Sequence, residues 1–342
     1  MTFQSSTPAL SSDEAGWALG EPGALVAPDA VLVRAIYQAL MCSGPSAGPR
    51  RWRETPHGLA IDLRVNVARV TVELEAASAP KAWEIVARSS PLALDVASLL
   101  LAMRAPTVRL APRLVRAAEV LDAKGCRRWG SERRGLESQL VAELEMLAAL
   151  RFGPGREPLF PLLPLGGPGS DFVYEPAQWL QRLFSEAPLR FLDRRILGFD
   201  HRANRGADVL AKKLAIHLSF STGARGMAAH TVGALVNALG LTTEEVASRR
   251  GRGGRLADRF DEALLRLEEC GLFKVRYRGD AHAAEGRTKG WVRDWLRREV
   301  TATALGRSPA SRDVRAHADH LAVASPDMGE AHTFRSRSAS AA

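Results

Sequence analysis

Apolar residues recur every three to four positions in two stretches of the chain, and both stretches have the same order of parts. In each, a short apolar helix ends at a glycine, an arginine-rich connection follows, and a longer amphipathic helix leads into a β-prone run. The first stretch covers residues 116–152 and the second covers 231–275. This order is typical of a winged helix-turn-helix. The pattern therefore predicts a mainly α (α+β) fold with two tandem winged helix-turn-helix domains.

The longer helix of each stretch has an apolar stripe at helical spacing. The stripes are Leu136, Leu140, Leu144 and Leu147 in the first copy, and Leu256, Phe260, Leu264 and Leu267 in the second. Gly125 and Gly240 close the two short helices, and Thr231 is the expected N-cap of the second one. The stripe begins later after Gly240 than after Gly125, which predicts a loop insertion in the second copy.

Other periodic segments complete the predicted organisation. We expect helices over 29–41, 92–103, 179–184, 205–220 and 291–300, a β-hairpin over 59–74, short strands over 107–110 and 190–197, a loop over 44–56 and a wing strand over 272–277. The expected domains are an N-terminal extension with the first winged helix (28–152) and a second winged helix with a C-terminal basic helix (177–303). They are joined by a Pro/Gly-rich extended linker (153–176), whose first few residues are alternatively the wing of the first repeat. The tails at 1–27 and 304–342 are expected to be disordered.

Composition fits a globular protein of two ordinary domains. Of 342 residues, 46% are apolar and 25% are charged. The most apolar window, 92–103, is too short to span a bilayer and contains Asp95. The N-terminus lacks the pattern of a secretory leader, and three cysteines without a CxxC fit a reducing compartment. We therefore expect a cytoplasmic protein without a membrane partner.

The net charge of +9 suits a polyanionic partner. The arginine bias of a GC-rich genome is the alternative explanation. Basic residues occur at the same place in both repeats, between the two helices, where a helix-turn-helix lies nearest to phosphates and base edges. The predicted DNA-binding residues are Arg127, Arg128, Arg133, Arg134 and Gln139 in the first repeat, and Arg249, Arg250, Arg252, Arg255, Arg259, Arg276 and Arg278 in the second.

Within that set, Arg255 with Arg259 and Arg134 with Gln139 are the candidates for base contacts. The alternative is that the Arg-Gly loops are solvated. Acidic residues on the longer helices, among them Glu143, limit DNA contact to the amino-terminal halves. One of the two heads is an alternative site for protein contact or dimerisation. Lys212 and Lys213 fit a solvated surface as well as a phosphate contact.

Signatures of enzymes are missing from the sequence. The segment Gly251–Gly254 lacks both the lysine and the preceding apolar strand of a phosphate-binding loop. No HExxH motif occurs, and no clustered acids lie on predicted strands as a metal-dependent nuclease requires. We expect no catalytic activity, cofactor or metal.

Five segments together resemble the plasmid-type replication initiator proteins, which have two winged-helix domains in tandem. The segments are Leu92–Met103, Ala117–Gly125, Arg133–Gly135, Leu235–Gly240 and Arg259–Gly271. The resemblance implies a protein that binds repeated sites on double-stranded DNA at an origin and opens the duplex or recruits replication machinery. In that family dimers commonly repress transcription and monomers initiate replication, so the resemblance also implies a homodimer. A winged-helix transcriptional regulator and a protein-interaction module without DNA binding are the alternatives.

Overall fold

The computed structural model describes residues 24–45, 51–101, 103–104, 112–126, 130–165, 171–222, 226–248, 252–278 and 290–305. Its helices are α1 (Val31–Met41), α2 (Ala79–Arg88), α3 (Leu92–Leu101), α4 (Ala117–Ala123), α5 (Ser131–Ala148), α6 (Gln178–Glu186), α7 (Ala207–Ser221), α8 (Val232–Ala238), α9 (Thr243–Ser248), α10 (Arg252–Glu269) and α11 (Trp291–Arg297). None of these described helices is long and apolar enough to cross a membrane.

The described strands form four small antiparallel sheets. They are β1 (Ala24–Pro28), β2 (Trp52–Thr55), β3 (Gly58–Val65), β4 (Ala68–Glu75), β5 (Met103–Arg104), β6 (Arg113–Arg116), β7 (Leu150–Phe152), β8 (Glu157–Pro158), β9 (Leu162–Pro164), β10 (Asp171–Tyr174), β11 (Leu189–Asp193), β12 (Met227–Thr231), β13 (Phe273–Tyr277) and β14 (Glu299–Ala304). The sheet orders are β11-β1-β5, β6-β10-β9, β12-β14-β13 and β2-β3-β4-β7-β8.

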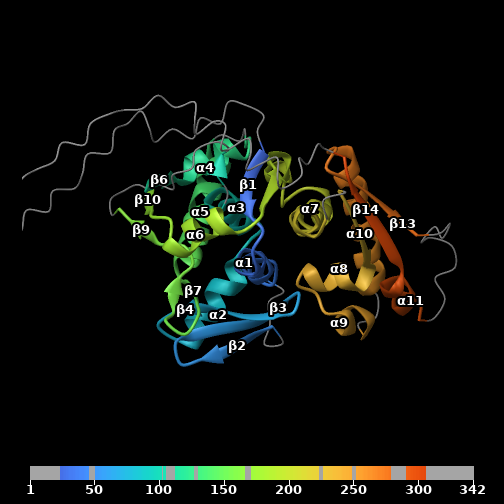
Figure 1. The fold of residues 1–342 in the computed structure, drawn as a ribbon, viewed down its shortest axis with the longest axis horizontal. Coiled ribbons are helices and arrows are strands. Elements are labelled where there is room, and N and C mark those ends of the chain that lie inside the picture. Colours follow the sequence, from blue (N-terminus) through green and yellow to red (C-terminus); the bar gives the residue numbers. More distant parts are fainter. Residues whose placement is uncertain are drawn as a thin grey trace, which may run out of the picture.

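Both repeats have winged-helix topology, which confirms the predicted fold class. In the second repeat β12 leads directly into α8, α10 follows, and β14 pairs with β12 on one side and β13 on the other. In the first, β6 leads directly into α4, α5 follows, and β10 pairs with both β6 and β9. Both sheets thus place their last strand in the middle. In Figure 1 the second repeat lies at one end of the molecule, with α7 facing the first.

The Pro/Gly-rich segment 153–176, predicted to be an extended linker, instead holds β8, β9 and β10. β9 and β10 supply the wing strands of the first repeat. Prolines are compatible with these positions because β8 and β9 are both edge strands. Leu159 and Phe160 anchor the segment, since both side chains are fully buried.

Several other boundaries also differ from the prediction. The expected N-terminal tail, 1–27, includes most of β1, which pairs with β11 and β5. The expected loop 44–56 contains β2, paired with β3. The predicted C-terminal basic helix ends earlier as α11, and β14 follows it. The predicted strand 107–110 and all but the first two residues of the expected tail 304–342 lie outside the described residues.

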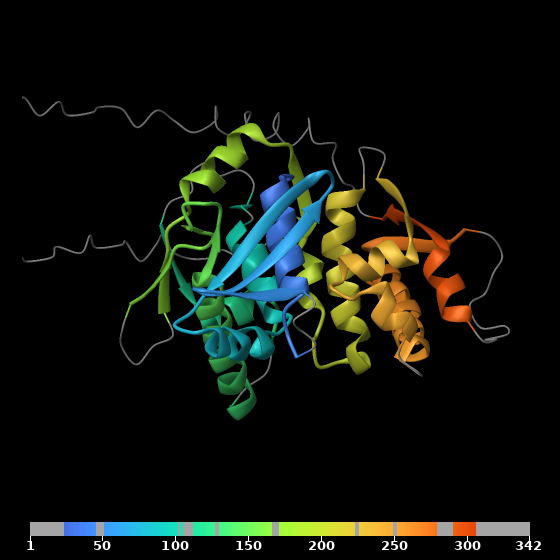
Figure 2. The same cartoon turned by 90° about the horizontal axis from the view of Figure 1, so that it is seen from below.

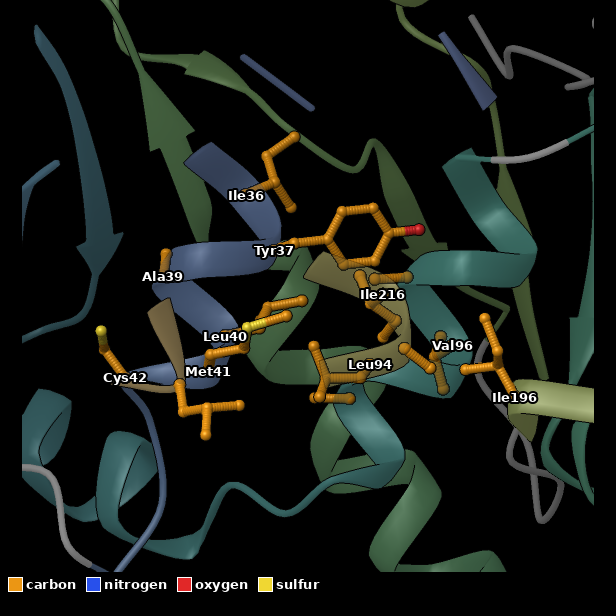
Figure 3. Packing of buried hydrophobic residues seen from close by; sticks show 14 of the residues in the cluster. Ile36, Tyr37, Ala39, Leu40, Met41, Cys42, Leu94, Val96, Ile196 and Ile216 are labelled. Atoms are coloured by element: carbon orange, nitrogen blue, oxygen red, sulfur yellow. The ribbon is translucent and has the colours of Figure 1, made fainter. Parts of the chain in front are cut away.

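The predicted hairpin over 59–74 is confirmed as β3 and β4, which pair along their whole length. Together with β2 they form a layer beside α1 (Figure 2). One hydrophobic cluster runs from this layer through both repeats. Figure 3 shows Tyr37 of α1, Leu94 of α3 and Ile216 of α7 within it. The repeats are therefore packed against each other through α1, α3 and α7.

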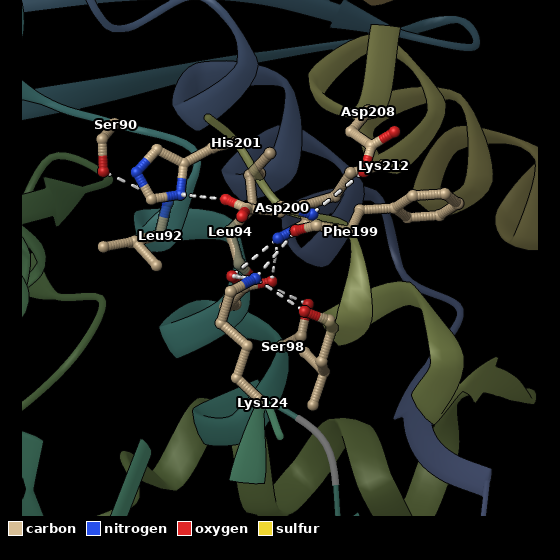
Figure 4. A network of polar contacts seen from close by, with 12 residues as sticks. Ser90, Leu92, Leu94, Ser98, Lys124, Phe199, Asp200, His201, Asp208 and Lys212 are labelled. Atoms are coloured by element: carbon tan, nitrogen blue, oxygen red, sulfur yellow. Dashed lines mark hydrogen bonds and ion pairs between the residues drawn. The ribbon is translucent and has the colours of Figure 1, made fainter. Parts of the chain in front are cut away.

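A buried ion cluster crosses the same junction (Figure 4). The Lys212 ammonium on α7 lies 2.6 and 2.7 Å from the two carboxylate oxygens of Asp95 on α3. Lys124 lies 2.8 Å from the same carboxylate and donates to the Leu197 and Phe199 carbonyls. Both Asp95 and Lys212 are 1% exposed, so the predicted solvated position of Lys212 is wrong. A lysine can occupy the interior here because a carboxylate from another helix meets it.

Lys213 also forms hydrogen bonds at the junction of the two repeats. Its ammonium donates to the carbonyls of Met41 and Leu239, at the carboxyl ends of α1 and α8. A positive charge is favourable there because it meets the negative end of each helix dipole. Burial lowers the pKa of Lys213 to about 8. Lys213 is therefore not a free surface cation.

Glu143 on α5 is also buried, although the helical pattern placed it on an exposed flank. Its carboxyl group accepts hydrogen bonds from the Ser90 amide at 2.6 Å and the Ser89 hydroxyl at 3.2 Å. These contacts fix the start of α3 against α5. Burial raises the pKa of Glu143 to about 7 despite these hydrogen bonds.

Candidate nucleic-acid interface

The helix-turn-helix of the second repeat is fixed by local capping. The Thr231 hydroxyl accepts a hydrogen bond from the Ala234 amide at 3.1 Å, which confirms Thr231 as the N-cap of α8. Gly240 follows with φ +85°, and a Cβ there would lie 2.5 Å from the Met41 carbonyl oxygen. Only glycine therefore allows the turn to approach α1 this closely.

The insertion predicted in the second copy forms helix α9 instead of a loop. The Thr242 hydroxyl accepts a hydrogen bond from the Glu245 amide at 3.1 Å. Thr242 and Glu245 have the spacing of a capping box, and this local signal is one from which the start of α9 could have been predicted. The short helix places α10 after a second turn.

α10 has one buried face and one charged face. Ala257, Phe260 and Leu267 are fully buried. On the opposite face, Arg255 and Arg259 are exposed one helical turn apart. Neither guanidinium has a hydrogen bond or ion pair with another residue in the described ranges. The amino-terminal half of α10 therefore presents two uncommitted arginines to solvent.

The carboxyl-terminal half of α10 is different. Its Arg266 is held by Asp208 at 3.2 Å and Glu269 at 2.6 Å. Exposed Glu262 follows the two free arginines along the helix. A phosphate backbone would be repelled by this acidic half, so the sequence-based restriction of DNA contact to the first turns of α10 agrees with the charge pattern.

The wing arginines of the second repeat are exposed but paired. Arg276 on β13 lies 2.7 Å from Glu268, and Arg278, just beyond the strand, lies 2.7 Å from Glu299. Exposed pairs of this kind contribute about 0–1 kcal/mol, so a phosphate could replace either carboxylate. Arg276 and Arg278 are therefore weaker candidates for DNA contact than the arginines of α10.

Among the described residues, the first repeat has fewer arginines without a partner than the second. Arg133 on α5 is 19% exposed and pairs with Asp122 at 2.9 Å and Glu137 at 3.1 Å. It thereby ties α4 to α5, and this geometry favours a structural role. Arg134 is exposed, and Gln139 is half-buried on α5.

The remaining predicted residues cannot be placed in the interface. Arg127, Arg128, Arg249 and Arg250 lie outside the described residues. Arg252 begins α10, but its side chain is not among those described. The site that the structure does bring together is the face of α10 with Arg255 and Arg259.

The fold and this face define a double winged-helix protein in which helix α10 of the second repeat bears two exposed arginines. No protein-family model matches the sequence, and no curated protein matches it. Among solved structures, the crystal structure of RctB domains 2-3 (RctB-155-483) is similar, with a TM-score of 0.41 and 10% sequence identity. The match covers 80% of this chain and 97% of that one.

Proposed function

We propose that this chain is a sequence-specific double-stranded DNA-binding protein, acting as a replication initiator, and that α10 is its main recognition helix. The observation that carries the proposal is the pair Arg255 and Arg259. They are exposed at the start of the second long helix of a winged helix-turn-helix and lack partners in the described chain. In this fold that helix enters the major groove with its first turns against the bases.

The two arginines have the chemistry for this role. A guanidinium donates two parallel hydrogen bonds to guanine or to a phosphate, and each good base contact contributes about 1–3 kcal/mol of discrimination. The paired arginines Arg276 and Arg278 on the wing side would then contact the backbone beside the groove. The proposal is of a binding protein without catalytic chemistry.

Binding sites selected from random duplex by the full chain test the proposal. Direct repeats are expected for an initiator, whereas a single palindrome would favour a transcriptional regulator. Failure to enrich any duplex, or an affinity that hardly changes between low and physiological salt, would favour the protein-interaction alternative.

The double variant Arg255→Ala/Arg259→Ala tests the recognition helix. We expect it to bind the selected site about a hundredfold more weakly, from two lost base contacts, with an unchanged melting temperature. Lys81→Ala/Arg88→Ala is the control, because it removes the same charge from exposed positions on α2 that already pair with Glu84. If the α10 variant melts early yet binds normally, the placement of the recognition helix is wrong.

A further inference from the structure

The β3–β4 hairpin has a rigid, well-defined tip. The two strands pair from Gly58 with Glu75 to Val65 with Ala68, and Asn66 makes the turn with φ +55°. Leu59 and Ile61 of β3 are buried at the layer with α1, so the alternate residues point outward. The outer face of the hairpin is thus fixed by its packing.

Two arginines face each other at this tip. Arg64 and Arg69 are directly opposite in register and both are exposed. Neither has a hydrogen bond or ion pair with a residue in the described part of the chain. Like charges at opposite positions destabilise a strand pair, so the arrangement contributes nothing favourable to the hairpin itself.

Elsewhere on the same outer face the cations are neutralised. Arg53 on β2 lies 2.9 Å from Asp62, and the Thr71 hydroxyl donates to the same carboxylate at 2.7 Å. Arg156 lies 3.1 Å from Glu73. Among the described cations of this face, Arg64 and Arg69 are therefore the two without an ion pair, although the charge of Arg69 also acts on Asp62.

The tip also presents an apolar group and lies near the second repeat. Val67 in the turn is 92% exposed, more than any other large apolar side chain described. Val65 and Asn66 line a small cavity with His217 and Phe220 of α7. Figure 2 shows the hairpin tip beside that helix. The tip is thus held at the junction of the two repeats.

We infer that the β3–β4 tip is an additional DNA-contacting element, in which Arg64 and Arg69 bind phosphates of the duplex outside the bases contacted by α10. A two-stranded ribbon fits a DNA groove, and guanidinium groups bind phosphate in a bidentate way. Val67 would then lie against the sugars of the groove wall. The inference rests on the proposed DNA binding and adds a backbone contact that neither winged helix supplies.

Salt titration of duplex binding by the full chain tests this inference. The probe is the selected site extended to about 40 base pairs, a length chosen to leave backbone for the tip on either side. Arg64→Ala/Arg69→Ala is expected to weaken binding equally for specific and random duplex. The slope of log affinity against log salt should fall by about 1.8, from two lost phosphate contacts. Hydroxyl-radical footprints should lose protection of one backbone segment away from the core of the site.

The control is again Lys81→Ala/Arg88→Ala, which has the same loss of net charge. Neither variant should melt below the wild type by more than a few degrees, since all four side chains are exposed and removal of Arg64 and Arg69 relieves a like-charge contact. If the hairpin variant has the slope and footprint of this control, the inference is wrong while the proposed function stands; an acidic protein partner for the tip would give that result. If the wild type binds no duplex, the proposed function and the inference both fail.

Discussion

Replacing Asp95 by Asn tests the buried ion cluster between the two repeats. The substitution keeps the size of the side chain but removes the negative charge that meets Lys212 and Lys124. Because no cavity is formed, the change in unfolding free energy measures the electrostatic contribution of Asp95. Removing one partner of a buried pair costs about 3–5 kcal/mol, because the remaining charge is left without compensation. Since Lys212 is 1% exposed, we expect a loss of unfolding free energy within that range.

The matched variant is Lys212→Met. It removes one ammonium group while Asp95 keeps Lys124 at 2.8 Å, so no uncompensated carboxylate is left in the interior. We expect Lys212→Met to lose less unfolding free energy than Asp95→Asn. The double variant should lose less than the sum of the two single variants, with a coupling energy of about 0.5–3 kcal/mol.

The assay is urea unfolding followed by circular dichroism at pH 7. Burial lowers the pKa of Lys212 even with Asp95 present, and removal of Asp95 should lower it further. A lysine with a depressed folded-state pKa destabilises the fold below its unfolded pKa. The unfolded lysine titrates alike in both proteins, so the stability deficit of Asp95→Asn depends on the two folded-state pKa values. The deficit should widen as the pH falls below the depressed folded-state pKa of Lys212 and narrow as the pH rises through it. A loss below about 1 kcal/mol, or a larger loss for Lys212→Met, would refute the assignment of a charge-compensating role to Asp95.

Three further predictions concern single positions. Glu143→Gln should be more stable than the wild type at pH 8 by up to about 3 kcal/mol, because the folded-state pKa of Glu143, about 7, exceeds the ordinary 4.5. The stability of the wild type therefore falls as the pH rises through that window. Melting curves from pH 5 to 8 should show the stability difference between the two proteins closing toward pH 5. Leu264→Ala should cost roughly 2–5 kcal/mol in urea unfolding, since this α10 side chain is 7% exposed, and a cost below about 1 kcal/mol would contradict its core position. Gly240→Ala should cost more than Gly125→Ala, because both glycines have positive φ but only Gly240 faces a backbone carbonyl; equal losses in the same assay would argue against the close approach of α8 to α1.

Periodicity was enough to predict most of the helices and the hairpin because their signals are local, whereas α2 was not predicted and α9 was expected to be a loop. The apolar stripes of α5 and α10, the N-cap Thr231 and the closing glycines all act within a few residues of where they lie. The wing of the first repeat had no such signal, since its prolines are tolerated only because β8 and β9 are edge strands. Strand β1 was missed for a related reason: its partner β11 lies far along the chain.

Charge placement was the harder part of the site to predict. A lysine on an amphipathic helix is ordinarily solvated, and the carboxylate that allows Lys212 to be buried comes from α3, 117 positions away in sequence. Glu143 was misplaced for the same reason, because its partners Ser89 and Ser90 belong to the start of another helix. Sequence spacing shows which side chains share a face but not which remote group meets them.

The described arginines of the two repeats, which look equivalent in the sequence, differ in the carboxylates that hold them. In the first repeat Arg133 forms ion pairs with Asp122 and Glu137, which makes it part of the contact between α4 and α5. In the second, the helix α9 separates the turn from α10, and Arg255 and Arg259 have no such carboxylates to hold them within the described chain. A guanidinium already bound to two acids must break those pairs before it meets a phosphate, whereas an unpaired one need not. Among the described arginines, Arg134 is exposed without a partner in the first head, and Arg255 and Arg259 are so in the second. On that ground we propose the second head as the main DNA-binding one.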